Sequence, residues 1–167
     1  MKLLSKLPFL VLFAVLSFSC STDNIDENAE AISKSLIVPE AKSIEIEILE
    51  LINNHRLSVG LHPMANMDLI KSQAYSHTEH MVIENEVSHD NFFERSNFLK
   101  ANAGAKVVSE NVAYGYTKAA SVVNAWLKSP SHRENIEGDF TNFDVSAEQN
   151  AEGNWFYTNI FIRNSIS

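Results

Sequence analysis

The sequence predicts an α+β fold, arranged as a three-layer α-β-α sandwich around a small antiparallel sheet. Between residues 41 and 128, apolar side chains recur at helical spacing in four segments. In residues 143–148 they alternate instead with polar side chains, as in a strand with one buried face. Residues 155–162 carry branched and aromatic side chains on both faces, so we expect helices to cover this strand from two directions.

The first two helices follow from their apolar stripes. A helix is predicted over residues 41–57, with Gly60 as its stop signal. A second helix is expected to be capped by Asn66 and to run to about Val82. The stripe of the first helix comprises Ile44, Ile48, Leu51 and Ile52.

Shorter elements follow these two helices. Residues 88–91 are predicted to form a loop, Phe92 to Lys100 a short helix, and residues 101–104 a break. Residues 109–113, with branched and small side chains, suggest an extended or turning segment.

The last helix and the hairpin complete the predicted fold. Thr117 is expected to cap a helix that ends near Lys128, and residues 151–154 to turn the chain between the two strands. The inner side of that helix is predicted to carry Ala120, Val123, Trp126 and Leu127.

The first 20 residues have the pattern of an export signal. Lys2 and Lys6 accompany an apolar run from Leu7 to Phe18, which is shorter than the roughly 20 residues that a membrane-spanning helix needs. The run ends beside Cys20, in a pattern that resembles the bacterial lipoprotein box. We therefore predict a lipoprotein-type signal peptide over residues 1–19 and a lipid on Cys20, which anchors the mature protein to the membrane at the cell envelope or cell surface.

The rest of the chain divides into a flexible acidic tether, residues 20–40, and one compact domain, residues 41–167. The formal net charge is -8 at pH 7, and removal of the signal would take away two lysines and no acid. This acidity argues against a nucleic-acid partner. Cys20 is the only cysteine, so the domain is expected to fold without disulfides and to lack a thiol nucleophile or a cysteine metal site.

Four short motifs within the domain carry its distinctive polar residues. They are NNHRLSVGLHP at 53–63, SHD at 88–90, SENVAYG at 109–115 and WLKSPSHRENI at 126–136. In this order they resemble the N-x-x-R-x-x-x-G-L-x-P-L motif, the first histidine loop, the E-N-[IVL]-A-x-G segment and the W-x-x-S-x-x-H-R-x-N-I-L motif of bacterial secreted proteins in the CAP (SCP) superfamily. That superfamily is named for cysteine-rich secretory proteins, antigen 5 and pathogenesis-related proteins. The resemblance covers about residues 44–163 and also implies an α-β-α sandwich.

The resemblance implies that His89, Glu110 and His132 meet in one cleft, with Asn111 and Ser129 beside them. Two imidazoles and a carboxylate form a ligand set suited to zinc, with one position left for water or substrate. Water bound to such a metal has a lowered pKa, which would permit hydrolysis. Many eukaryotic relatives have a second glutamate at the position of Ser129, and its absence here removes a carboxylate that could act as a general base.

Each of these residues also has a structural interpretation. His132 could cap carbonyl groups at a helix end, and His89 could fix its own loop beside Asp90. Glu110 could accept hydrogen bonds from backbone donors. The structural and metal-binding roles are compatible, because a carboxylate often orients a histidine that binds metal.

The other histidines fit structural roles better. His77 and His80 are three residues apart on the second helix, a spacing that can hold a metal, but no HExxH pattern surrounds them and packing or exposure is favoured. His55 and His62 are expected to be structural or solvent-facing, and Arg133 to pair with surface acids.

Three classes of function remain. The domain is expected to be a binding module for a lipid-like or peptide ligand, a metal-dependent, peptidase-like hydrolase acting on envelope or extracellular substrates, or an interaction protein with an inactive cleft. Hydrolysis needs a base and an activated nucleophile, and the chain offers one matched carboxylate and no recognisable serine or cysteine triad. Binding or interaction is therefore placed ahead of catalysis.

Overall fold

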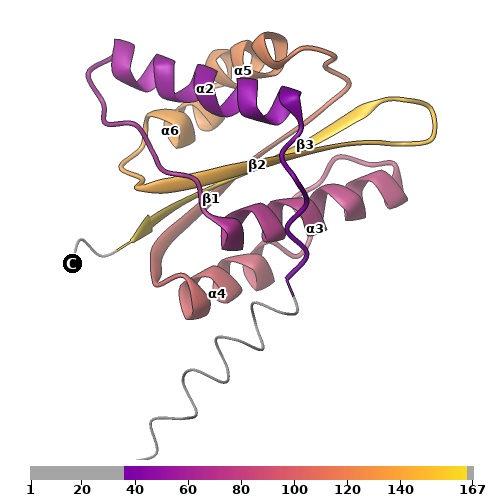
Figure 1. The fold of residues 1–167 in the computed structure, drawn as a ribbon, viewed down its shortest axis with the longest axis horizontal. Coiled ribbons are helices and arrows are strands. Elements are labelled where there is room, and N and C mark those ends of the chain that lie inside the picture. The colour runs from indigo at the N-terminus through magenta and orange to yellow at the C-terminus, as the bar shows by residue number, and fades with distance from the viewer. Residues whose placement is uncertain (1–35, 165–167) are drawn as a thin grey trace, which may run out of the picture. The chain divides into compact units, whose positions relative to one another are not determined.

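The computed structural model describes residues 36–164 (Figure 1). The predicted signal peptide, Cys20 and most of the tether lie outside these residues. Within residues 36–164, no helix is long and apolar enough to cross a membrane. The elements are α2 (Ser43–Ser58), α3 (Asp68–Glu84), α4 (Phe92–Asn102), β1 (Ala105–Tyr114), α5 (Ala119–Lys128), α6 (Pro130–Glu137), β2 (Asn142–Gln149) and β3 (Trp155–Asn164).

The three strands form one antiparallel sheet in the order β1-β3-β2. The hairpin of β2 and β3 confirms the alternation seen in the sequence. The central strand β3 is buried without interruption from Phe156 to Ile162. This confirms that both faces of β3 are covered.

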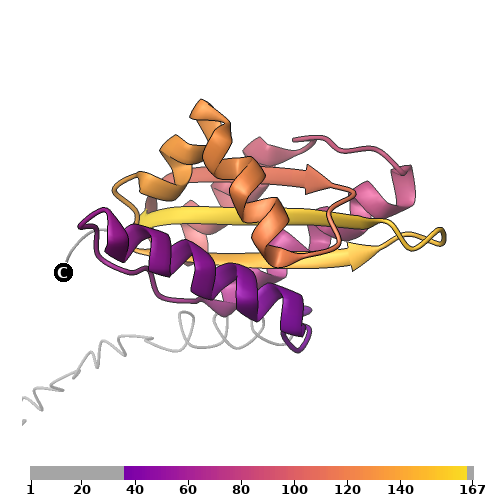
Figure 2. The same ribbon diagram turned by 90° about the horizontal axis from the view of Figure 1, so that it is seen from above.

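Helices cover the two faces of the sheet as separate layers. α2, α5 and α6 lie on one face, and α3 and α4 lie on the other, as the two views show (Figures 1 and 2). The larger apolar cluster joins the first group of helices to the sheet, and a second cluster joins α3 and α4 to its opposite face. The predicted α+β fold with an α-β-α sandwich is therefore confirmed.

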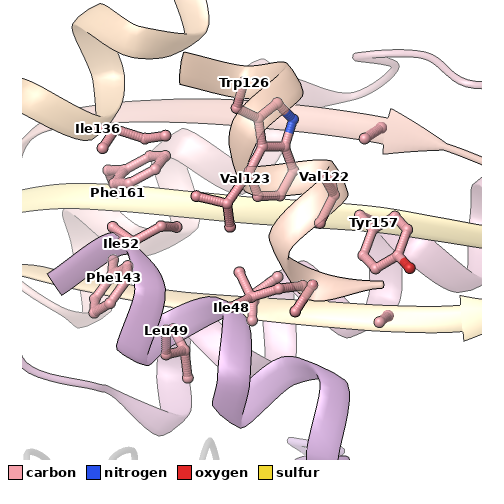
Figure 3. Packing of buried hydrophobic residues seen from close by; sticks show 14 of the residues in the cluster. Ile48, Leu49, Ile52, Val122, Val123, Trp126, Ile136, Phe143, Tyr157 and Phe161 are labelled. Carbon is pink, nitrogen blue, oxygen red and sulfur yellow. The ribbon is translucent and has the colours of Figure 1, made fainter. Parts of the chain in front are cut away.

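The larger cluster shows how the first layer is held (Figure 3). Trp126 of α5 and Ile136 of α6 are fully or almost fully buried, beside Ile48 and Ile52 of α2 and over Phe161 of β3. Full burial of each such side chain contributes about 1.5–3 kcal/mol. This packing places α6, which carries His132, against β1.

Side chains and backbone from both helical layers close the outer edge of β2. At its start, the backbone of Ala65 pairs with Thr141 and Phe143. Further along, the Ala147 N–H donates to Glu45 Oε1 at 2.8 Å, and Lys71 Nζ donates to the Val145 carbonyl at 2.9 Å.

Glu45 and Lys71 also bind each other. Lys71 Nζ lies 2.7 Å from Glu45 Oε2, and both residues are buried. Glu45 belongs to α2 and Lys71 to α3, so this ion pair joins the two helical layers around the edge of the sheet.

The outer edge of β1 is closed in part. Hydrogen-bonded and non-hydrogen-bonded residue pairs alternate along an antiparallel ladder. In β1, the residues with even numbers therefore direct their backbone N–H and C=O groups away from β3. The Val112 carbonyl accepts a hydrogen bond from Trp126 Nε1 at 3.1 Å, and the Glu110 carbonyl accepts one from Asn135 Nδ2 at 3.3 Å.

Two predicted helix caps are wrong. Asn66 does not cap α3, whose N-cap is Met67; the Asn66 amide donates instead to Asp144 Oδ2 at 3.4 Å. Thr117 does not cap α5, which begins after Lys118 without a side-chain cap. For Asn66, a tertiary contact takes the side chain that could have capped the helix.

Two other details of the α5–α6 region differ from the prediction. Val123, Trp126 and Leu127 pack inward as predicted, but Ala120 is exposed and Ala119 is buried in its place. α6 has no counterpart among the predicted elements. It begins at Pro130, whose fixed φ suits the first turn of a helix.

Candidate functional site

The three residues predicted to share a cleft come from three elements around the edge strand β1. His89 lies in the loop before α4, Glu110 in β1 and His132 in α6. Side chains alternate along a strand, so Glu110 points to the layer of α3 and α4 whereas Asn111 points to α6. The site therefore lies across the outer edge of β1, where the two helical layers meet.

The Glu110 carboxylate is buried and fully engaged. Arg95 of α4 binds it with two hydrogen bonds, Nε to Oε2 and Nη2 to Oε1, both 2.9 Å long. His89 Nδ1 lies 2.8 Å from Oε1. Such a bidentate pair fixes the plane of the carboxylate as well as its charge.

The electrostatics of Glu110 follow from these contacts. Burial opposes ionisation, but the hydrogen bonds from His89 and Arg95, together with the positive charge of Arg95, hold the pKa of Glu110 below its usual range. Glu110 is therefore a carboxylate at neutral pH. His89 Nδ1 consequently donates a hydrogen bond to Glu110, and His89 Nε2 makes no hydrogen bond in the described structure.

The loop that carries His89 is held by two further contacts. Arg95 Nη1 donates to the Asp90 carbonyl at 2.5 Å, and His77 Nε2 lies 2.8 Å from the Ser88 carbonyl. His77 is only 2% exposed, and burial followed by the charge of Arg95 lowers its pKa. His77 therefore packs as a neutral side chain beneath the loop.

A network of amides ties α6 to β1. Asn111 Nδ2 donates to the His132 carbonyl at 3.0 Å, and Asn135 Nδ2 donates to Asn111 Oδ1 at 2.8 Å. Ser109 Oγ donates to Asn135 Oδ1 at 2.5 Å. These bonds position the first turn of α6, and with it the His132 ring.

Burial lowers the pKa of His132, and the charge of nearby His89 lowers it further. His132 is thus coupled electrostatically to His89, and a cleft shared by the two rings stays a prediction. Ser129 is the N-cap residue of α6 and places its Oγ 3.3 Å from Ser131 Oγ. The position where many eukaryotic relatives have glutamate therefore has no carboxylate.

These contacts limit how the site can hold a metal. Within residues 36–164, no three His, Cys, Asp or Glu side chains are arranged to hold an ion. Glu110 fits the role of orienting His89 better than that of a direct ligand, because both of its oxygens are occupied. His89, whose side chain is 53% exposed, and His132 fit the role of imidazole ligands. A zinc site with His89 and His132 as ligands, and with Glu110 orienting His89, stays a prediction.

Other polar residues of the motifs have structural roles. Arg56 is buried and donates to the carbonyls of Ile136 and Gly138 at 2.7 and 2.9 Å, which fixes the end of α6. Arg133 pairs with Glu137 at 2.9 Å, as predicted for a surface charge. His55 Nε2 lies 2.8 Å from the same carboxylate.

Arg95 is the functional residue that was not predicted from the sequence. It stands in the short helix directly after the histidine loop, and it is only 6% exposed. An arginine among the apolar positions of a short helix was the available signal. Its partner Glu110 lies 15 positions further along the chain, so the pair forms only in the folded protein.

The three-stranded antiparallel sheet between two layers of helices places the protein in a class of small α+β sandwich domains. The family model described as "CAP: Cysteine-rich secretory protein family" matches residues 49–161, and the chain belongs to this family. The membership confirms the resemblance seen in the four motifs.

Similarity to individual proteins agrees with the family. The chain is 30% identical over 122 residues to the uncharacterized protein YkwD of Bacillus subtilis. The matched region covers 70% of this chain and 48% of YkwD. The chain thus spans about half the length of YkwD.

Two solved structures share the fold. An outer surface protein from Borrelia burgdorferi has a TM-score of 0.68 and 19% identity, covering 78% of this chain and 99% of that one. An extracellular protein containing a SCP domain from Bacillus anthracis has a TM-score of 0.63 and 27% identity, covering 72% of this chain and 40% of that one.

Proposed function

We propose that this protein is an exported, lipid-anchored CAP domain that acts as a binding module. Its cleft holds a divalent metal, with zinc as the expected ion, through His89 and His132, and it takes a lipid-like or peptide ligand. The observation that carries the proposal is the arrangement around β1. Glu110, paired with Arg95, orients His89 on one side of β1, the Asn111 amide binds the His132 carbonyl on the other, and the charge of His89 acts on His132.

The state of Glu110 favours binding over catalysis. A general base needs a free lone pair and a pKa near the working pH. Glu110 has both oxygens occupied and a lowered pKa, and Ser129 supplies no second carboxylate. Glu110 is therefore poorly suited to activate water, and a base for hydrolysis would have to come from the histidines.

The two histidines, in contrast, fit the requirements of metal ligands. His89 uses Nδ1 toward Glu110, which leaves Nε2 as the nitrogen for a metal, and the lowered pKa of His132 keeps its ring neutral. A metal bound there would attract the carboxylate of a peptide or the phosphate of a lipid headgroup. Glu110 and Arg95 would keep His89 in position for this role.

Calorimetry with zinc tests the metal site. Zinc is titrated into the mature protein and into the His89→Ala, His132→Ala double variant. His62→Ala serves as a control, because His62 is exposed and its ring makes no hydrogen bond in the described structure. We expect the double variant to lose an ion that the control retains. Equal affinity and stoichiometry in all three proteins would exclude this site.

Export and anchoring rest on the signal pattern that ends at Cys20. They agree with the extracellular and outer-surface descriptions of the two structural neighbours. Partition between detergent and aqueous phases tests the anchor. The protein should enter the detergent phase, and Cys20→Ser should move it to the aqueous phase. A Cys20→Ser protein that stays with detergent would refute lipid anchoring.

A panel of peptide and ester substrates, with and without chelator, separates a binding module from a metal-dependent hydrolase. We expect no turnover above the level of the double variant. Turnover that is lost both with chelator and in the double variant would put hydrolysis first.

A further inference from the structure

A polar hollow of about 410 Å³ lies between α3 and α4. This volume is within the range of about 300–1,000 Å³ that is usual for small-molecule sites. The hollow adjoins the site described above, because the buried Arg95 lines the hollow and also binds Glu110.

The residues that line the hollow form one stripe on each helix. Both stripes have the spacing i, i+3, i+4 and i+7, which places their side chains on a single helix face. The stripe of α3 is Gln73, Ser76, His77 and His80. The stripe at the start of α4 and along it is Asn91, Glu94, Arg95 and Phe98.

Stripes that face each other between two helices normally carry apolar side chains, which pack together. Among the described residues that line this hollow, Phe98 alone is apolar. The two faces therefore leave a polar space between them instead of a packed contact, and this composition suits a polar ligand.

Several of the lining side chains are free to bind such a ligand. Within residues 36–164, the side chains of Gln73, Ser76, Asn91 and Glu94 make no hydrogen bond. Asn91 is the N-cap residue of α4, and asparagine is among the best capping residues, yet its side chain does not cap the helix. Its carboxamide is thus left for the hollow.

The buried residues of the hollow select against an anion. Arg95 uses its donors on Glu110 and on the Asp90 carbonyl, so it offers little to a phosphate or a carboxylate. His77 Nε2 faces the Ser88 carbonyl, which leaves Nδ1 as an acceptor, and Nδ1 has no partner among the described residues. A buried acceptor without a partner is costly, so His77 favours a ligand that carries hydrogen-bond donors.

The hollow is equally poor for a cation. Glu94 is the one lining residue whose negative charge is not paired among residues 36–164, and it is exposed, where a single ion pair contributes little. No three His, Cys, Asp or Glu side chains of the described residues are arranged to hold a metal. A neutral ligand with hydroxyl groups, which both donate and accept hydrogen bonds, fits these groups best.

We propose that this hollow binds a neutral saccharide. The carboxamides of Gln73 and Asn91 each present a donor beside an acceptor, and the Glu94 carboxylate accepts from two neighbouring hydroxyls. Phe98 supplies the apolar surface of a ring, against which the C–H face of a sugar packs. The saccharide site goes beyond the metal and the lipid-like or peptide ligand of the cleft.

NMR titration of the nitrogen-labelled mature protein tests the site. The probes are maltose, cellobiose and N,N′-diacetylchitobiose, each added to about 10 mM, so that a Kd of about 1 mM is measurable. At least one disaccharide should shift backbone amides of α3 and α4 around the hollow. Absence of any shift with all three would overturn the proposal. Chelator is present throughout, so the outcome does not depend on a metal in the cleft.

A matched pair of double variants locates the binding. Gln73→Ala, Glu94→Ala removes one amide and one carboxylate from the hollow and should weaken binding at least tenfold. Asn97→Ala, Glu84→Ala removes the same kinds of side chain from the same two helices at exposed positions outside the hollow, and should bind as the unaltered protein does. Equal urea midpoints of the two variants would show that both are folded, and equal affinities would then refute the site.

N-acetyl-lysine amide serves as a cationic probe of the same hollow. We expect it to leave the amides of α3 and α4 unshifted at about 10 mM. If it shifts them where the disaccharides do not, the hollow is a cation site and the saccharide proposal is wrong.

Discussion

Replacement of Lys71 by methionine removes the positive member of the ion pair that joins the two helical layers. Methionine keeps most of the length and the apolar stem of lysine, so packing changes little. Glu45, which is 0% exposed, then loses its close cation and keeps only the more distant Lys42, whose Nζ lies 3.9 Å from Glu45 Oε1. The Val145 carbonyl also loses its donor.

The expected magnitude follows from what remains around Glu45. Breaking a buried ion pair by removing one partner destabilises a protein by about 3–5 kcal/mol. Glu45 keeps two backbone donors, Ala147 N at 2.8 Å and Lys42 N at 2.7 Å, which compensate part of its charge. We therefore expect a loss near the lower limit, about 3 kcal/mol.

Urea unfolding of the mature protein at pH 7 measures this loss as a shift of the midpoint at constant slope. The double variant Glu45→Gln, Lys71→Met should recover part of the stability, because it leaves no buried charge. Lys100→Met, at the exposed end of α4, is the control and should change stability by less than about 0.5 kcal/mol. A Lys71→Met protein that is as stable as this control would refute the argument.

Three further predictions concern the site and its support. Arg95→Met should destabilise the protein by about 3 kcal/mol in urea unfolding, because Glu110 keeps its burial and loses its bidentate partner; a loss under about 1 kcal/mol would contradict this. Trp126→Phe removes the bond from Nε1 to the Val112 carbonyl and should cost about 1–3 kcal/mol, whereas an unchanged midpoint would show that the bond contributes nothing. The lowered pKa of Glu110 and of His77 predicts stability that is present above their unfolded pKa values, about 4.3 and 6.5, and lost as pH falls through the lower folded values. The raised pKa values of Asp144 and Glu148 act in the opposite direction, so the urea midpoint in chelator is compared with that of His77→Gln. The unaltered protein should lose more stability from pH 7 to pH 4 than this variant, and equal losses would refute the linkage for His77.

The elements whose apolar side chains recur at a regular spacing were predictable from the sequence. The hairpin of β2 and β3 alternates strictly on one strand and is apolar on both faces of the other. β1 has no such pattern, because it is an edge strand with an exposed first half and with polar residues such as Ser109 and Asn111 directed at α6. The sequence therefore left residues 109–113 as an extended or turning segment.

The site was predictable only in part, because short motifs identify residues but carry no information about long-range contacts. The short motifs identify His89, Glu110 and His132 as residues, but not what surrounds them. The engagement of both oxygens of Glu110 depends on Arg95, which is on another element, and local propensity carries no information about that contact. The cap expected at Asn66 failed in the same way, since the Asn66 side chain bonds to Asp144 78 positions away.

The closure of the sheet edges bears on how these molecules behave when many are crowded together. Ala65, Glu45 and Lys71 occupy the backbone groups along β2, and side chains of α5 and α6 occupy two carbonyls of β1. The part of β1 that stays open carries the charge of Lys106 and an irregular register, two features that discourage strand addition. Neighbouring copies of the described domain therefore find little open main chain at the sheet edges with which to pair a strand.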